Sequence, residues 1–240
     1  TGNTDKGNGT EKASETDAET SASKNEDEAN EVINIPEDAK VIAGTVMASE
    51  ILNLLDVDVV GVPTTKKGLP EKYQGITEIG MSMKPDIEKI VSLGANVLVT
   101  DGTLKESLDP QLEGKGIEIV YMDNNSYEDL SKTVLALGKA FGKEANAGKF
   151  IADMKKKEEE IKDKIKDKED PKVMVVFGTT ESFMLATKGS FVGGMVEKLG
   201  ATNVTDELDQ KSPAPYAPFS LEQAAKLDPD IILRLTHMEV

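Results

Sequence analysis

Two thirteen-residue stretches of this chain, 87–99 (IEKIVSLGANVLV) and 221–233 (LEQAAKLDPDIIL), align without a gap. Glu88 matches Glu222, and the apolar positions of the two copies coincide. Each copy has the pattern of a short helix, a turn and a buried strand, which is typical of parallel α/β structure. Chance similarity is the weaker explanation, because the match includes an exposed-looking glutamate. One such unit in each half of the chain predicts two α/β lobes with a cleft between them.

The rest of the chain after residue 40 alternates apolar runs of strand length with helical patterns. The expected strands are 41–44, 57–62, 96–101, 117–123, 172–178, 182–187 and 230–235. The expected helices are 45–55, 86–94, 127–142 and 221–228. This alternation with short turns predicts an α/β fold in which helices cover parallel sheets.

Residues 143–168 have a different pattern, with apolar residues three or four positions apart and Lys and Glu elsewhere. This pattern predicts one long helix, either a rigid connector between lobes or only a long surface helix. We expect four segments: an acidic tether at 1–38, a first lobe at 39–142, a connecting helix at 143–169 and a second lobe at 170–240.

The first 38 residues contain 11 Asp and Glu, 3 Lys and almost nothing apolar. A segment of this composition cannot bury enough surface to offset the entropy of ordering, so we expect disorder. It is either an arbitrary flexible terminus or a tether that holds a folded body away from a surface.

Composition excludes several classes of function. A net charge of −16 argues against nucleic acid as a partner, because binding phosphates needs clustered Lys and Arg. The absence of Cys excludes disulfides, Cys-ligated zinc, iron–sulfur clusters and covalent haem attachment. No apolar run is long enough to span a bilayer, and no apolar leader is present, so we expect any signal peptide to have been removed.

Two residues stand out as possible ligands of a metal. His237 is the single histidine, and it follows the expected strand 230–235. The carboxyl ends of parallel strands are where α/β sheets bind ligands. Met83 lies in a polar loop, EIGMSMKPD at 78–86, where core packing explains a methionine less well. Imidazole and thioether together ligate haem iron in many electron carriers. An ordinary surface histidine and an ordinary core methionine are the alternatives.

Residues 40–240 resemble the haem-receptor lipoproteins of Gram-positive iron-regulated surface systems. These belong to the wider class of helical-backbone substrate-binding proteins for siderophores, cobalamin and haem. The stretches that carry the resemblance are 45–73, 78–99, 182–204 and 229–237, with G-x-x-M-x-P and I-L-R-L-x-H as their specific parts. The resemblance implies that Met83 and His237 are the two axial ligands of the haem iron. It also implies that the second lobe continues past residue 240, so we expect the lobe of this chain to be incomplete.

The resemblance also implies contacts with the haem propionates and with a transporter. Backbone N–H groups of Val46 and Met47, and of Thr65 and Lys66, would bind the propionates. The free N–H groups at a helix start favour anions, which gives the first pair a physical reason. Glu88 and Glu222 would each meet an Arg of a membrane permease, although a solvated glutamate is the commoner state at either position alone.

The expected function is therefore that of an extracellular haem receptor, not an enzyme. By resemblance it is a monomer, held on the outer face of a Gram-positive cell membrane by a lipid anchor. A cell-wall donor protein would supply its haem, and it would deliver the haem to an ABC importer for iron acquisition. A ferric-siderophore receptor on the same scaffold is the alternative. A haem-dependent oxygenase, or a hydrolase that uses His237, is a third possibility that no motif supports.

Overall fold

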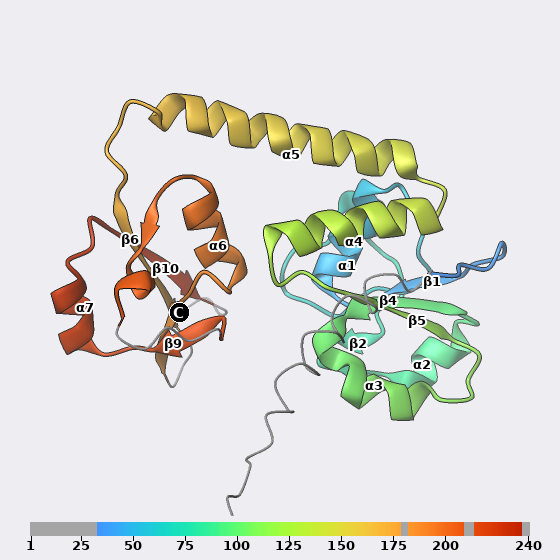
Figure 1. The fold of residues 1–240 in the computed structure, drawn as a ribbon. Coiled ribbons are helices and arrows are strands. Elements are labelled where there is room, and N and C mark those ends of the chain that lie inside the picture. The colour runs from blue at the N-terminus through green and yellow to red at the C-terminus, as the bar shows by residue number, and fades with distance from the viewer. Residues whose placement is uncertain (1–32, 179–181, 209–213, 237–240) are drawn as a thin grey trace, which may run out of the picture. The chain divides into compact units, whose positions relative to one another are not determined.

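The computed structural model describes residues 33–178, 182–208 and 214–236 (Figure 1). Most of the expected acidic tether and His237 lie outside these residues. Residues 34–240 form one compact unit. Within the described ranges, no helix combines the length and the apolar character needed to cross a membrane.

The first lobe is built on a parallel sheet in the order β1-β4-β5. Its strands are β1 (Val41–Ala43), β4 (Val97–Asp101) and β5 (Glu118–Met122). Its helices are α1 (Val46–Leu54), α2 (Ile87–Ser92), α3 (Lys105–Leu112) and α4 (Tyr127–Ala140). The central strand β4 is buried over four consecutive residues, as expected for a strand covered on both faces. Ile42 and Leu98 of the sheet pack against Ile90 of α2 and against Leu108 and Leu112 of α3.

The prediction of a regular strand at 57–62 is wrong, although the end of this segment is extended. The N–H of Val60 donates to the carbonyl of Val41, and the N–H of Ala43 donates to the carbonyl of Gly61. Pairing is limited to single bridges, Ile42 with Gly61 and Val62 with Glu78. The ladder stops there because Pro63 has no N–H to continue it. The segment nevertheless widens the sheet beyond β1.

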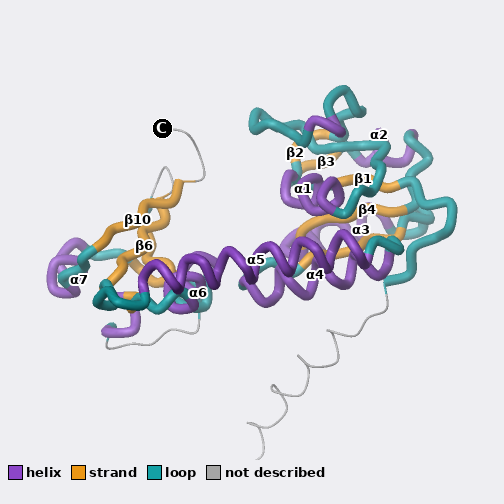
Figure 2. The backbone as a smooth tube through the Cα atoms, turned by 90° about the horizontal axis from the view of Figure 1, so that it is seen from above, coloured by secondary structure: helices purple, strands orange, loops and turns teal. Residues whose placement is uncertain are grey.

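A 22-residue helix, α5 (Glu144–Ile165), follows α4 and confirms the long helix expected there (Figure 2). Its first part packs against α4 and α1, where Asn146 Nδ2 donates to the carbonyl of Leu55 at 3.0 Å. Ala147 is its one buried residue. Ion pairs one turn apart, such as Lys162 with Glu158 at 2.6 Å, stabilise the exposed surface of this helix.

The second sheet has the order β10-β6-β7-β9, and β8 also pairs with β6. Its strands are β6 (Lys172–Gly178), β7 (Phe183–Ala186), β8 (Thr202–Asn203), β9 (Tyr216–Pro218) and β10 (Ile231–Thr236). Two helices, α6 (Phe191–Lys198) and α7 (Leu221–Leu227), belong to this lobe. Three short 3-10 turns, η2 (Glu71–Tyr73), η3 (Gly102–Leu104) and η4 (Val204–Glu207), complete the described elements together with a β2–β3 hairpin.

The expected parallel pairing is confirmed between β6 and its neighbours β10 and β8. Strands β7 and β9 depart from it, because β7 runs antiparallel to β6 and β9 runs antiparallel to β7. The connection from Gly178 to Phe183 is far too short for the crossover that a parallel pair needs, so β7 must turn back along β6. The second sheet is therefore mixed.

The internal repeat is confirmed as a repeated structural unit. Helix α2 leads into β4, and helix α7 leads into β10, each through a tight turn. At the turn, Gly94 has φ 62° and the aligned Asp228 has φ 42°. A positive φ is uncommon for a residue other than glycine, so its recurrence at the aligned position shows the same backbone path in both copies.

Candidate functional site

The start of α1 lies at the carboxyl edge of the first sheet. Gly44 N–H donates to the carbonyl of Val99 at 2.8 Å, and Thr45 then caps the helix by accepting from the N–H of Ala48 at 3.0 Å. Val46 and Met47 occupy the first turn, where helix geometry leaves N–H groups without an intrahelical carbonyl. Such groups favour an anionic oxygen.

The loop that contains Thr65 and Lys66 leaves the neighbouring extended segment at the same edge. The Thr64 N–H donates to the carbonyl of Gly80 at 2.8 Å, and the Thr64 hydroxyl donates to Glu78 Oε2 at 2.8 Å. Thr65 Oγ1 accepts from the Lys67 N–H at 3.0 Å, and Lys66 is exposed. These bonds hold the loop against the segment 78–80.

Met83 lies at the tip of a small hairpin that follows this segment. The hairpin pairs β2 (Gly80–Met81) with β3 (Lys84–Pro85) and leaves Ser82 and Met83 as its two-residue turn. The Met83 side chain is 77 % exposed. An exposed thioether at a hairpin tip is not core packing, so the core alternative for Met83 is excluded. Gly80 has φ 96°, and an added Cβ would approach the Asp86 nitrogen to 3.0 Å, so the hairpin base requires glycine.

The structure brings the first-lobe candidates to one edge. The segment that ends at Val62 lies beside β1, and Thr64 lies beside Gly80, so both loops and the Met83 hairpin leave adjacent extended segments. Met81, also exposed on this hairpin, was not among the sequence candidates, although its position two residues before Met83 was a signal. His237 lies outside the described residues; it directly follows β10, whose Thr236 pairs with Gly178.

The two candidate docking carboxylates occupy the second residue of α2 and of α7. Both side chains are exposed. Glu222 accepts from Lys226 one turn later at 2.8 Å, while Glu88 makes no ion pair within the part of the chain that the structure describes. Their equivalent placement follows from the repeat. It leaves each carboxylate accessible to a partner.

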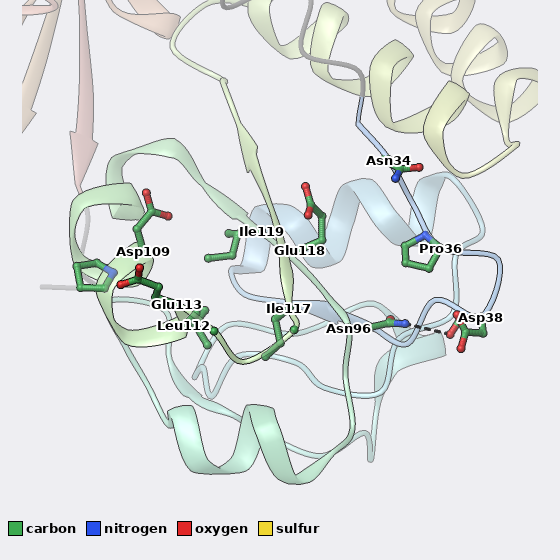
Figure 3. Close-up of a pocket in the computed structure, with 13 residues that line it drawn as sticks. Asn34, Pro36, Asp38, Asn96, Asp109, Leu112, Glu113, Ile117, Glu118 and Ile119 are labelled. Atoms are coloured by element: carbon green, nitrogen blue, oxygen red, sulfur yellow. Dashed lines mark hydrogen bonds between the residues drawn. The ribbon is translucent and has the colours of Figure 1, made fainter.

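A hollow of about 990 Å³ lies at the other end of the first sheet (Figure 3). Its lining includes Asn96 before β4, the residues 117–119 at the start of β5, and four carboxylates: Asp38, Asp109, Glu113 and Glu118. Asn96 Nδ2 donates to the carbonyl of Asp38 across part of it at 3.4 Å. The hollow is at the amino ends of the strands, whereas α/β sheets bind ligands at the carboxyl ends. Within the described residues, no group of three His, Cys, Asp or Glu could hold a metal ion.

Residues 41–240 match the model of a family described as periplasmic binding protein. A curated relative is the high-affinity heme uptake system protein IsdE of Staphylococcus aureus, 30 % identical over 199 residues. That match covers 82 % of this chain and 67 % of the relative. The crystal structure of S. aureus IsdE complexed with heme superposes with a TM-score of 0.73 and 28 % identity, covering 84 % of this chain and 77 % of that one.

Two further solved structures are similar to this chain. One is an ABC transporter substrate-binding protein from Listeria monocytogenes, with a TM-score of 0.74 and 29 % identity, covering 84 % of this chain and 77 % of that one. The other is FeuA from Bacillus subtilis complexed with ferri-bacillibactin, with a TM-score of 0.69 and 25 % identity, covering 86 % and 73 %. The chain belongs to the periplasmic binding protein family and is a substrate-binding protein of the ABC importer type, not an enzyme.

Proposed function

We propose that this chain binds haem outside the cell and delivers it to an ABC importer for iron acquisition. The observation that carries the proposal is the exposed Met83 thioether at a hairpin tip, beside two loops that offer backbone N–H groups. A thioether is a soft ligand that suits haem iron, and N–H groups at a helix start suit carboxylates. The similarity to a heme uptake protein supports the same ligand.

In this proposal, Met83 and His237 are the axial ligands of the iron, so no position is left for O₂ or peroxide. The N–H groups of Val46, Met47, Thr65 and Lys66 bind the propionates. Glu88 and Glu222 dock on Arg residues of the permease, because carboxylates and guanidinium groups form paired hydrogen bonds. A lipid anchor before the acidic segment would hold this monomeric receptor on the outer face of the cell membrane, where a cell-wall protein supplies haem.

The proposed domain organisation assigns 39–142 and 170–240 to the two ligand-binding lobes and 143–169 to the helix between them. Residues 1–38 serve as the tether. The position of Met83 before the helix of the first repeat copy, and of His237 after the strand of the second copy, supports a site that uses one ligand from each lobe.

A ferric-siderophore receptor is the second candidate, favoured by the similarity to FeuA. The two are separated by parallel titrations of the full chain with ferric haem and with a ferric catecholate siderophore. The proposal expects one equivalent of haem, bound non-covalently with a six-coordinate absorption spectrum, and weak siderophore binding. Tight binding of the siderophore, together with a haem absorption spectrum that the protein leaves unchanged, would establish the second candidate instead.

A further inference from the structure

Lys198 is the last residue of α6, and its side chain reaches two other helices. Its Nζ donates to Glu128 Oε1 at 3.0 Å and lies 4.7 Å from the centroid of the Tyr127 ring, both on α4. It also lies 3.9 Å from Glu158 Oε2 on α5. Helix α4 belongs to the first lobe and α6 to the second. Among the residues that the structure describes, Lys198 and Glu128 form the only ion pair that joins the two lobes.

Both members of this ion pair lie at helix ends that favour their charge. Glu128 is in the first turn of α4, and Lys198 is in the last turn of α6. The helix dipole therefore stabilises each charge where it stands. The pKa of Lys198 is raised, chiefly by its hydrogen bond to Glu128, and the same bond is the main cause of the lowered pKa of Glu128. Both groups stay charged at neutral pH.

The surroundings of Lys198 distinguish it from an ordinary surface lysine. Its side chain is 29 % exposed, and that of Glu158 is 19 % exposed, although Glu128 is open to solvent. An ammonium group near an aromatic ring gains attraction from the ring's π-electrons. Partly buried charges are also screened less by salt than exposed ones. The contacts of Lys198 together are therefore stronger than one exposed ion pair.

Apolar packing between α5 and α6 is incomplete next to these contacts. A hollow of about 190 Å³ is lined there by Lys198 and Tyr127 and by apolar side chains of both helices. Its apolar members are Met154 and Ile161 of α5 and Phe191, Met195 and Leu199 of α6. Protein interiors leave few voids larger than a water molecule, so a hollow of this size shows that side-chain packing alone does not fix α6 in place. The charged contacts supply what the packing lacks.

We infer that Lys198 is a latch between the lobes, which holds the end of α6 on the start of α4 and restricts the motion of one lobe relative to the other. Its consequence for the ligand rests on the proposed function, in which Met83 and His237 approach the iron from different lobes. Lobes already held at the correct spacing lose less conformational freedom when the ligand binds. If the latch is absent, only the molecules with that spacing bind, and the apparent affinity falls by the same fraction.

The test measures the distance between the lobes in the ligand-free full chain by pulsed electron paramagnetic resonance. The chain contains no cysteine, so two introduced cysteines carry the only spin labels. Ser107→Cys on α3 and Ala225→Cys on α7 place one label on an exposed position of each lobe. The background with intact Lys198 should give one narrow distance distribution.

Lys198→Met keeps the apolar stem and removes the charge, and Glu128→Gln removes the charge of the partner. Each should broaden the distribution, and the double variant should be no broader than either single one, because both changes remove the same contact. Lys198→Arg should keep the narrow distribution. Lys149→Met is the matched control, since it breaks a 2.9 Å ion pair with Asp153 inside α5 and should change nothing. A distribution as narrow in Lys198→Met or Glu128→Gln as in the background would overturn the latch.

Haem titration of the same proteins separates the latch from the proposed function. Lys198→Met should bind haem about fivefold more weakly, the upper value for one exposed ion pair. Equal haem affinities alongside a broadened distribution would contradict the consequence for the ligand. Absence of haem binding by the unaltered chain would overturn the proposed function, whereas the ligand-free distances would still decide whether the latch exists.

Discussion

The Asp230 carboxylate accepts a 2.8 Å hydrogen bond from the backbone N–H of Lys172, and the Asp230 N–H donates back to the carbonyl of Lys172 at 2.9 Å. The first lobe repeats this reciprocal pair. Asn96, at the position aligned with Asp230, accepts from the N–H of Lys40 at 2.7 Å and donates its own N–H to the carbonyl of Lys40 at 3.2 Å. In each lobe the pair joins two neighbouring parallel strands at their amino ends. The two lobes therefore share a hydrogen-bonding pattern as well as a sequence pattern.

Removal of one acceptor tests the importance of this pair. Asp230→Ala should lower the free energy of unfolding by about 1 kcal/mol, because it leaves the Lys172 N–H without its partner. Asp230→Asn restores the residue type found at position 96 and should keep most of the stability. Urea unfolding at neutral pH compares the three proteins. Equal stabilities of the Ala and Asn variants would contradict the role of the side-chain acceptor.

Gly193 of α6 packs against the backbone of the preceding turn. An added Cβ would lie only 1.9 Å from the Thr187 carbonyl oxygen, which is part of the backbone and cannot move aside cheaply. Gly193→Ala should therefore destabilise the second lobe by at least about 3 kcal/mol. Gly148→Ala is the control: its added Cβ meets nothing within 4 Å inside α5, so it should stabilise the helix by about 0.5–1 kcal/mol. Thermal unfolding measures both, and similar effects of the two changes would refute the steric argument.

Glu197 is a half-buried residue whose carboxylate has one oxygen, Oε1, shielded from solvent. Burial raises the pKa of Glu197, and the hydrogen bond and negative charge of Asp206 raise it further, while Lys188 lowers it. Its Oε1 has no hydrogen-bond partner among the described residues. A pKa raised by folding contributes stability below the ordinary glutamate pKa, and this stability is lost as the pH rises through the raised value.

Glu197→Gln should therefore raise the midpoint of thermal unfolding at pH 7 by about 2–4 °C, because the amide stays neutral. The advantage should shrink at pH 4, where the native carboxyl is protonated. Scanning calorimetry across this range gives the comparison. An advantage that does not change with pH would show that the effect is packing and not ionisation.

Glu88→Ala combined with Glu222→Ala should leave haem affinity unchanged and abolish haem uptake by cells. Each exposed ion pair contributes little alone, about 0–1 kcal/mol, so the single variants should be only partly impaired. Glu106→Ala is the matched control, since Glu106 is also a first-turn glutamate, on α3. Normal uptake in cells that carry the double variant would rule out the docking role.

The sequence predicted the elements whose periodicity is strong. The copies at 87–99 and 221–233, the apolar strand at 172–178 and the long helix after residue 143 all match the structure. Helix α3 was not expected, because Pro110 lies inside it and its apolar residues are few. The prediction of parallel strands was wrong for β7, and β9 was not expected, since periodicity identifies a strand without fixing its partner.

The candidate site was predictable only in part. Met83 was suggested by its polar loop, and the structure adds that its side chain is exposed. The ring contacts of the second lobe were not predicted, because Tyr216 meets Phe177 and Phe183 meets Phe219 only through the pairing of β7 with β6 and with β9. Contacts of this kind depend on strand order, which no single stretch of sequence contains.

The central claim is that Met83 and His237 ligate haem iron, and the absorption spectrum of the haem-loaded full chain tests it most directly. Unaltered protein should give a six-coordinate ferric spectrum with the near-infrared charge-transfer band of a thioether ligand. Met83→Ala should keep the haem, lose that band and shift the reduction potential downward, because a thioether favours ferrous iron. His237→Ala should weaken binding more, because the imidazole is the stronger donor. A haem spectrum that is the same in the unaltered protein and in both variants would contradict the assignment.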